Sequence, residues 1–308
     1  MMGRANLGVD FGPAALRAAV VKKKRGGLVT ERCRVVPVSA DVLRIFDISD
    51  TASPPQEKLV DKLRELLDPI AEGEERISLS LPDIWGRLHL VEVKSGFKNK
   101  EEGRDFLRWR LKAMLPFAPE DIHLDFQVLK KPSAGAGLVL VSLIPRQVVE
   151  TISDVCESAG YFPVVIDFHG LNCLNYYYSR LDWEENLSLI IVEDENLSFF
   201  YFRDGLLGYH RSHRISPKRD RIFDDIRLSI IDCEKRFPSL RRGAVYLHTD
   251  DKDGPALLEG IKPLFSGRGI LLKTDLEEFF QTGNAAVGSL SQNQAAAIGA
   301  AFRLLRAV

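Results

Sequence analysis

The sequence predicts an α/β fold made of two related halves, and three patterns lead to this prediction. Short strands joined by tight turns open the chain at residues 5–38, and a second set of three short strands begins near residue 187. Between the two sets, residues 88–167 have the order of a compact βαββαβ unit. Helical segments follow each set of strands, so we expect two halves of similar construction with a smaller unit inserted in the first.

Length and composition narrow the class of protein. A chain of 308 residues suggests two domains, because single cores stop growing near ~250–300 residues. The composition is globular, with 45% hydrophobic and 28% charged residues, and a net charge of −1 provides no field to attract nucleic acid. No apolar run approaches the ~18 residues of a spanning helix, and the start of the chain lacks a signal peptide. We therefore expect a cytoplasmic protein with no nucleic-acid partner and no direct membrane insertion.

The first half begins with strands at 5–11, 15–22 and 28–38, whose turns contain "DFGPA" and "KKRGG". The next segment, "PPQEKLVDKLRELLDPI", predicts a helix because its apolar residues recur at helical spacing. Those on its apolar face are Leu59, Leu63, Leu66, Leu67 and Ile70. A strand at 76–82 with alternating apolar residues follows.

The inserted unit reads as strand "LHLVEVK", helix "KEEGRDFLRWRLKAML", strands "IHLDFQVLK" and "GLVLVSLIP", helix "RQVVETISDVCESAG" and strand "FPVVIDF". On its first helix, the stripe Phe106, Trp109, Arg110 and Met114 has helical spacing. We expect this stripe to face the core of the unit, with an edge that could line a groove.

The second half repeats the three-strand opening and continues with a charged helix near 219–236, a strand at 243–249 and a helix near 254–265. A short strand and an Ala-rich helix end the chain. We assign residues 1–186 to the first half, including the inserted unit at about 88–167. Residues 187–290 form the second half, and we expect the C-terminal helix at 291–308 to return to the first.

Residues with reactive side chains form no recognisable catalytic or metal-binding motif. The four cysteines have no CxxC spacing and lie in apolar stretches, which is typical of small buried hydrophobic residues. His210 and His213 in "HRSHR" would face opposite ways on a strand. The GxSxG motif of hydrolases is absent. We therefore expect no catalytic residues and no metal site.

Three stretches carry a resemblance to a known family. They are "MLPFAPEDIHLDFQVL" at 114–129, residues 141–177, and "FRDGLLGYHR" with Asp204, Gly205 and Arg211. Together they resemble the type IV pilus assembly protein PilM family, a relative of the cell-division protein FtsA and of the cytoplasmic part of the secretion protein GspL. The resemblance implies an actin-like (ribonuclease H-like, duplicated) fold with an inserted subdomain, and a place beside the inner membrane reached through partners.

In such folds, glycine-containing hairpin turns present backbone amides to the phosphates of ATP, and an acid in each turn holds Mg²⁺ or its waters. Asp10 and Gly12 match the first of these turns, and Arg17 stands where the family usually has lysine. The next position is Pro13, which has no amide hydrogen. Asp10, Gly12 and Arg17 are therefore the candidate remnant of a nucleotide site.

The other two turns depart further from the family pattern. Counted from Asp204-Gly205, the second turn falls on 191–197, which puts Ile191 at the position of the metal-binding acid and Glu193 at that of the glycine. In the third turn, Thr249-Asp250-Asp251 replaces glycines. Added acids oppose a polyphosphate. We expect no cofactor and a degenerate ATPase without enzymatic activity, the alternative being an ATP-binding, slowly hydrolysing PilM-type protein with Mg²⁺.

The resemblance implies an adaptor that holds the N-terminal tail of a PilN-like inner-membrane protein between the inserted unit and the first half. A pilus motor ATPase is a further partner that the family suggests. Leu115, Pro116 and Phe117 are the candidate groove residues, because the proline ends a helix and leaves apolar side chains at its edge. The alternative is that Phe117 fills the core of the inserted unit. A third possibility is the soluble cytoplasmic part of a GspL-like protein.

Overall fold

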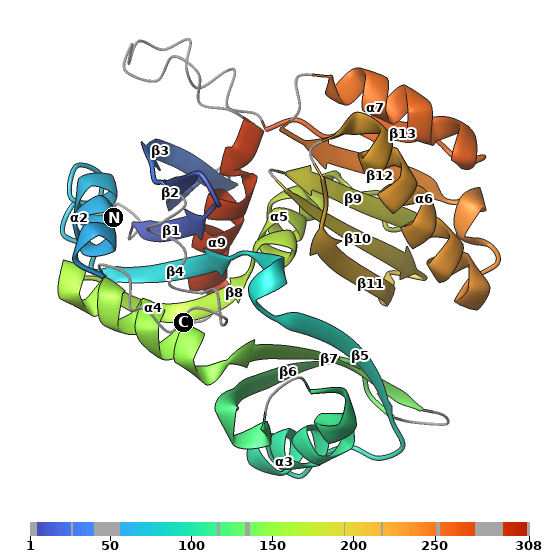
Figure 1. Ribbon diagram of the computed structural model, residues 1–308, viewed down its shortest axis with the longest axis horizontal. Coiled ribbons are helices and arrows are strands. Elements are labelled where there is room, and N and C mark those ends of the chain that lie inside the picture. The colour runs from blue at the N-terminus through green and yellow to red at the C-terminus, as the bar shows by residue number, and fades with distance from the viewer. Residues whose placement is uncertain are drawn as a thin grey trace.

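The protein is described here by a computed structural model (Figure 1). It describes residues 5–25, 27–39, 56–115, 118–132, 136–193, 195–216, 218–250, 253–274 and 292–306.

Two five-stranded sheets with the same strand order form the two halves. The first has the order β3-β2-β1-β4-β8, and the second has the order β11-β10-β9-β12-β13. In each sheet the three opening strands pair antiparallel, and the remaining strands are added in parallel. The predicted duplication is therefore present in the topology.

The strands of the first sheet are β1 (Asn6–Phe11), β2 (Ala15–Lys24), β3 (Gly27–Pro37), β4 (Arg76–Leu81) and β8 (Phe162–Phe168). Those of the second are β9 (Leu187–Glu193), β10 (Asn196–Arg203), β11 (Leu206–Arg214), β12 (Ala244–Thr249) and β13 (Gly269–Leu271).

Helices and sheets alternate across the molecule (Figure 1). Helices α2 (Gln56–Leu67) and α4 (Arg146–Ala159) cover the outer face of the first sheet, and α6 (Arg219–Arg236) and α7 (Gly254–Ile261) cover that of the second. Between the sheets lie α5 (His169–Tyr177) and α9 (Ala295–Arg306), which share a core with strands of both halves. None of the described helices has both the length and the apolar content needed to cross a bilayer.

Helix α9 lies unusually close to its neighbours. It packs on β1, β2, β4 and α5, so this helix rests against the first sheet. A Cβ atom at Gly8 of β1 would lie 2.0 Å from the carbonyl oxygen of Ala297, and one at Gly299 would lie 1.8 Å from that of Asn172. Glycines on both sides therefore allow α9 to fit between the sheet and α5.

The inserted unit is smaller than the sequence predicted. Its antiparallel sheet has the order β5-β7-β6, formed by β5 (Arg87–Val93), β6 (Ile122–Lys130) and β7 (Gly137–Pro145), with α3 (Lys100–Leu111) packed on it. The predicted boundary at residue 167 is wrong, because β8 pairs with β4 and α4 packs against α2. The insertion therefore ends at Pro145, and the helix and strand after it complete the first half.

The predicted core stripe on α3 is also wrong in part. Leu107 and Leu111 point into the core of the inserted unit, whereas Trp109 is 73% exposed and Met114, just after the helix, is 63% exposed. Phe106 packs partly against that core. The apolar residues at 109 and 114 thus face solvent.

Of the three candidate groove residues, only one is placed. Leu115 is half-buried and packs against the core of the inserted unit. Pro116 and Phe117 lie outside the described residues. Their assignment to a partner groove stays a prediction.

Candidate functional site

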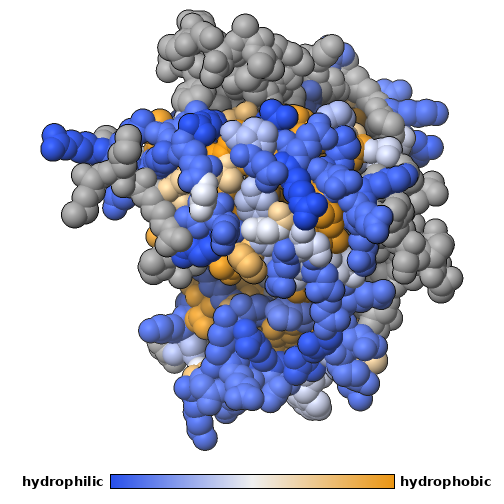
Figure 2. Space-filling model, turned by 90° about the vertical axis from the view of Figure 1, so that its left-hand side faces the viewer, coloured by the Kyte–Doolittle hydropathy of each residue, from blue (hydrophilic) through white to orange (hydrophobic). Residues whose placement is uncertain are grey.

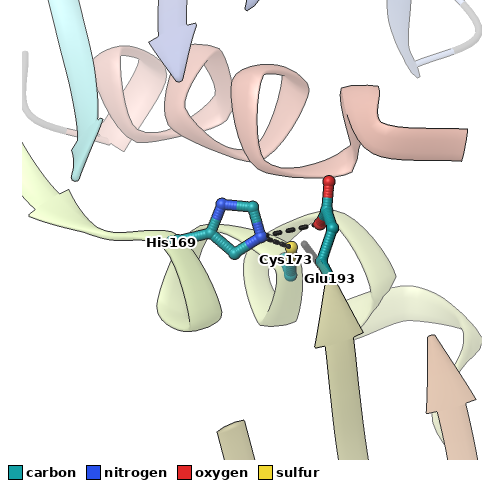
Figure 3. A group of neighbouring side chains, drawn as sticks. All are labelled: His169, Cys173 and Glu193. Atoms are coloured by element: carbon teal, nitrogen blue, oxygen red, sulfur yellow. Dashed lines mark hydrogen bonds and ion pairs between the residues drawn. The ribbon is translucent and has the colours of Figure 1, made fainter. Parts of the chain in front are cut away.

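A cluster of buried polar side chains lies where the two halves meet. Asp10 stands near the end of β1 in the first sheet, and Glu193 ends β9 in the second. Their side chains are 0% and 2% exposed. Between them, His169 begins α5 (Figure 3). Two carboxylates from equivalent strands thus approach one imidazole from opposite halves of the molecule.

His169 connects the two carboxylates. Its Nδ1 lies 2.9 Å from Oδ1 of Asp10, and its Nε2 lies 2.7 Å from Oε2 of Glu193. Burial opposes the charged ring, but Cys173, Asp10 and Glu193 together raise the pKa of His169 well above its ordinary value. The shift favours a charged imidazole, which can donate one hydrogen bond to a carboxylate of each half.

Glu193 has the complementary electrostatics. Burial favours its neutral form, but His169, His248 and Arg17 hold the pKa of Glu193 well below its ordinary value. The sequence predicted that Glu193 puts a negative charge where the phosphates of a nucleotide would lie. In the structure, Arg17, His169 and His248 surround this carboxylate, and its effect on a nucleotide stays a prediction.

Arg17 on β2 completes the first part of the cluster. Its Nη1 donates to Oδ2 of Asp10 at 3.1 Å and lies 4.0 Å from Oε1 of Glu193. The guanidinium also covers the turn, since a Cβ atom at Gly12 would lie 2.2 Å from the same nitrogen. Asp10, Gly12 and Arg17 therefore lie together, as the sequence indicated. In the structure their contacts are with one another, because Arg17 pairs with Asp10 and lies over Gly12.

Cys173 and His248 extend the cluster toward the second half. Cys173 is one turn after His169 on α5, with its Sγ 3.4 Å from Nε2 of that ring (Figure 3). Burial raises the pKa of the Cys173 thiol to about 11. His248 on β12 lies with Nε2 3.3 Å from Oε2 of Glu193 and Nδ1 2.8 Å from the hydroxyl of Tyr177.

A third buried carboxylate, that of Asp83, bridges the halves beside this cluster. Asp83 follows β4 and accepts hydrogen bonds from the backbone amide of Gly170 and the hydroxyl of Ser198 on β10. Burial raises the pKa of Asp83 above its ordinary value. The junction is thus held by polar contacts from both sheets and α5.

The third candidate turn is only partly described. Thr249 is buried at the end of β12, and Nδ2 of Asn293, before α9, donates to Oδ2 of Asp250 at 3.2 Å. Asp194 and Asp251 lie outside the described residues. The carboxylate of Asp250 therefore accepts a hydrogen bond from another residue of the protein.

Sequence reasoning missed three members of the cluster, His169, Cys173 and His248. A signal for the first two was present, because "HGLNC" places a histidine and a cysteine four residues apart on a helix. His248 had no comparable signal, since it stands alone in an apolar strand. Treating Cys173 only as a buried hydrophobic residue was incomplete.

Comparison with known proteins identifies the family. The family model of the type IV pilus assembly protein PilM matches residues 8–213, more than half of the chain. The chain belongs to this family. No curated protein sequence matches it significantly.

Solved structures of related shape agree with this family. A PilM–PilN type IV pilus biogenesis complex contains a chain with a TM-score of 0.75 and 17% identity, covering 97% of this chain and 98% of that one. A Bacteroides thetaiotaomicron protein with an actin-like ATPase fold follows with a TM-score of 0.53 and 12% identity, covering 88% and 91%. These structures confirm the predicted actin-like fold.

The polar cluster therefore lies between the two halves of an actin-like member of the PilM family. The sequence resemblance assigns Asp10 and Gly12 to contact with a nucleotide. In the structure, the carboxylate of Asp10 and the amide of Gly12 have partners within the protein.

Proposed function

We propose that this PilM-family protein is a scaffold of a type IV pilus assembly machine, which binds the N-terminal tail of a PilN-like inner-membrane protein and has lost ATP binding. The main observation in favour of lost ATP binding is that both carboxylate oxygens of Asp10 have partners within the protein. One of its carboxylate oxygens accepts a hydrogen bond from Arg17 and the other from His169. Both partners belong to the protein itself, so Mg²⁺ would have to compete with them for each carboxylate oxygen.

Displacing these partners would be costly. A hydrogen bond to a charged group contributes about 1.5–3 kcal/mol, and Mg²⁺ would have to replace two of them at a carboxylate that is 0% exposed. The turn itself also has few donors for a phosphate. The amide of Gly12 donates to the carbonyl of Ala15 at 3.0 Å, and Pro13 has no amide hydrogen.

The partner proposal draws on a different observation. The PilM–PilN complex resembles this chain over nearly the full length of both chains. On the inserted unit, Trp109 and Met114 expose apolar side chains, and the face in Figure 2 shows apolar residues among hydrophilic ones toward its lower part. Exposed apolar side chains in a polar surround favour binding of a short peptide.

Two titrations by calorimetry test the proposal. We expect the synthetic N-terminal tail of a PilN-like protein to bind the full chain. We expect Mg-ATP to bind no tighter than about millimolar, which corresponds to ~4 kcal/mol. Micromolar ATP binding would overturn the loss of the nucleotide site and favour a slowly hydrolysing PilM-type protein. Absence of tail binding would overturn the adaptor role.

A further inference from the structure

The junction between the halves contains a set of side chains suited to a metal ion. His169 and Cys173 lie one turn apart on α5, and Glu193 approaches them from β9 (Figure 3). One ligand atom from each residue lies within 4.8 Å of the other two, and all three residues are buried. We propose that His169, Cys173 and Glu193 bind Zn²⁺, or a similar thiophilic divalent cation, and that this ion links the two halves.

The distances are close to those of a bound site. Zinc forms bonds of about 2.0–2.3 Å in a tetrahedron, which places its ligand atoms roughly 3.3–3.6 Å apart. The Nε2 of His169 is 3.4 Å from Sγ of Cys173 and 2.7 Å from Oε2 of Glu193. A small outward movement of the Glu193 carboxylate would make room for the ion.

The protein supplies three ligands. The group whose ligand atoms lie within 4.8 Å of one another contains an imidazole, a thiolate and a carboxylate, those of His169, Cys173 and Glu193. Nitrogen and sulfur ligands favour zinc over the oxygen-binding Mg²⁺. A water molecule would complete the tetrahedron. Nε2 of His248 lies 3.3 Å from the same carboxylate oxygen of Glu193 and helps to orient it.

The imidazole of His169 has the outer contact that a metal ligand usually has, and His248 is held in a similar way. A metal-bound histidine commonly has its other ring nitrogen held by a carboxylate or another polar group. Nδ1 of His169 lies 2.9 Å from Asp10, and Nδ1 of His248 lies 2.8 Å from the hydroxyl of Tyr177. In each ring, Nε2 is therefore directed toward Glu193.

One further observation favours an ion over hydrogen bonds alone. Oε1 of Glu193 is buried and has no hydrogen-bond partner among the described residues. The charges in the cluster are compatible with the ion, because a divalent ion and Arg17 offset Asp10, Glu193 and a Cys173 thiolate. On binding, the ion takes the places of the Nε2 proton of His169 and the thiol proton of Cys173, and both protons leave to solvent.

Metal substitution tests this inference on the full chain. We expect one zinc per chain to remain after equilibration with Zn²⁺ and gel filtration. Co²⁺ should give a near-ultraviolet thiolate-to-cobalt absorption band, which Cys173→Ala removes. Cys156→Ala is the matched control, because Cys156 is an equally buried cysteine on α4 in the first-half core, and this variant should keep the band.

Further variants keep the test independent of folding. Asp10→Asn removes the carboxylate behind His169 and should weaken zinc binding by about 10–100-fold. If Cys173→Ala does not fold, Cys173→Ser removes the sulfur with little change of volume, and circular dichroism checks each variant.

Absence of stoichiometric zinc in the unmodified protein, or an unchanged cobalt band without the Cys173 sulfur, would overturn the inference. The metal site is a proposal separate from the scaffold function. A protein that contains no zinc after this treatment but still binds the PilN-like tail would overturn the metal site and leave the scaffold function in place.

Discussion

The family resemblance assigns Arg17 to a nucleotide site, but in the structure its guanidinium pairs with a carboxylate of the protein itself. Its side chain is 4% exposed, donates to Asp10 and covers the turn at Gly12. Breaking a buried pair by removing one partner leaves the other charge poorly compensated. Arg17 therefore both stabilises the protein and occupies one carboxylate oxygen of Asp10.

Replacing Arg17 by methionine tests that coupling. We expect Arg17→Met to lower the free energy of unfolding by about 3–5 kcal/mol, because Asp10 keeps only His169 as a cationic partner. Lys62→Met is the control, since Lys62 forms an exposed ion pair with Glu65 and should contribute less than about 1 kcal/mol. Urea denaturation measures both. Equal small losses in the two variants would mean that the Arg17 pair does not stabilise the junction.

The candidate site was only partly predictable at the residue scale. Asp10, Gly12 and Arg17 belong to one hairpin, so a local pattern could indicate them. The alignment that puts Glu193 at a glycine position of the family stays a prediction, because the two hairpins differ in the length of their turns. The β1–β2 pairing ends at Phe11 and Leu16, whereas the β9–β10 pairing ends at Glu193 and Asn196. His248 meets Glu193 through the pairing of β12 with β9 in the second sheet, whereas His169 meets it only after the two halves have come together.

At the scale of elements, the strands and helices were predictable but the boundary of the inserted unit was not. Periodicity indicates that residues near 146–159 form an amphipathic helix and that those near 162–168 form a strand. It does not reveal which sheet a strand joins. Pairing of β8 with β4 decides this, and it involves residues more than eighty positions apart in the chain.

The exposed side of α3 leads to a prediction about partner binding. Trp109→Ala should change the free energy of unfolding by no more than about 0.5 kcal/mol, because the side chain is mostly in water. It should weaken binding of the PilN-like tail by about 1–2 kcal/mol or more, as expected for an aromatic contact residue. Thermal unfolding and calorimetric titration measure the two effects.

Leu107→Ala, on the buried side of the same helix, is the matched comparison. It should cost about 2–5 kcal/mol of stability, because Leu107 is fully buried in the core of the inserted unit. If Trp109→Ala leaves tail affinity unchanged, this face of α3 is not the binding surface.

The close approach of α9 to β1 predicts a strong effect of one methyl group. In Gly8→Ala the new Cβ would meet backbone atoms of Ala297 and Ala301 at 2.0 and 2.4 Å, which a side-chain rotation cannot relieve. We expect a loss of about 1–3 kcal/mol or more. Gly96→Ala is the control, since no atom lies within 4 Å of a Cβ placed there. Similar chemical denaturation midpoints for the two variants would contradict this packing.

At the scale of the whole molecule, the two halves form one body. The core around α5 and α9 includes Ala19 of the first sheet and Leu189 of the second, and the buried network joins Asp10 to Glu193 through His169. The inserted unit is built differently. Most of its buried residues form a separate core between Val91 and Leu143, although Leu140 and Ile144 of β7 belong to the cores of the halves.

Removing the inserted unit therefore tests directly whether the two halves fold without it and whether it carries the partner surface. Arg87 pairs with Leu143, so the chain enters and leaves the unit side by side, and a short Gly-rich linker can replace residues 87–145. We expect the shortened protein to remain folded but less stable, because it loses the contact between β5 and β11 and the buried side chains of Leu140 and Ile144. Binding of the PilN-like tail should be lost, because the proposed surface lies on the unit.

Cooperative thermal unfolding and a tail titration would measure the two properties. An unchanged affinity for the tail would place the partner surface on the two halves. A protein that no longer unfolds cooperatively would show that the halves need the inserted unit to fold.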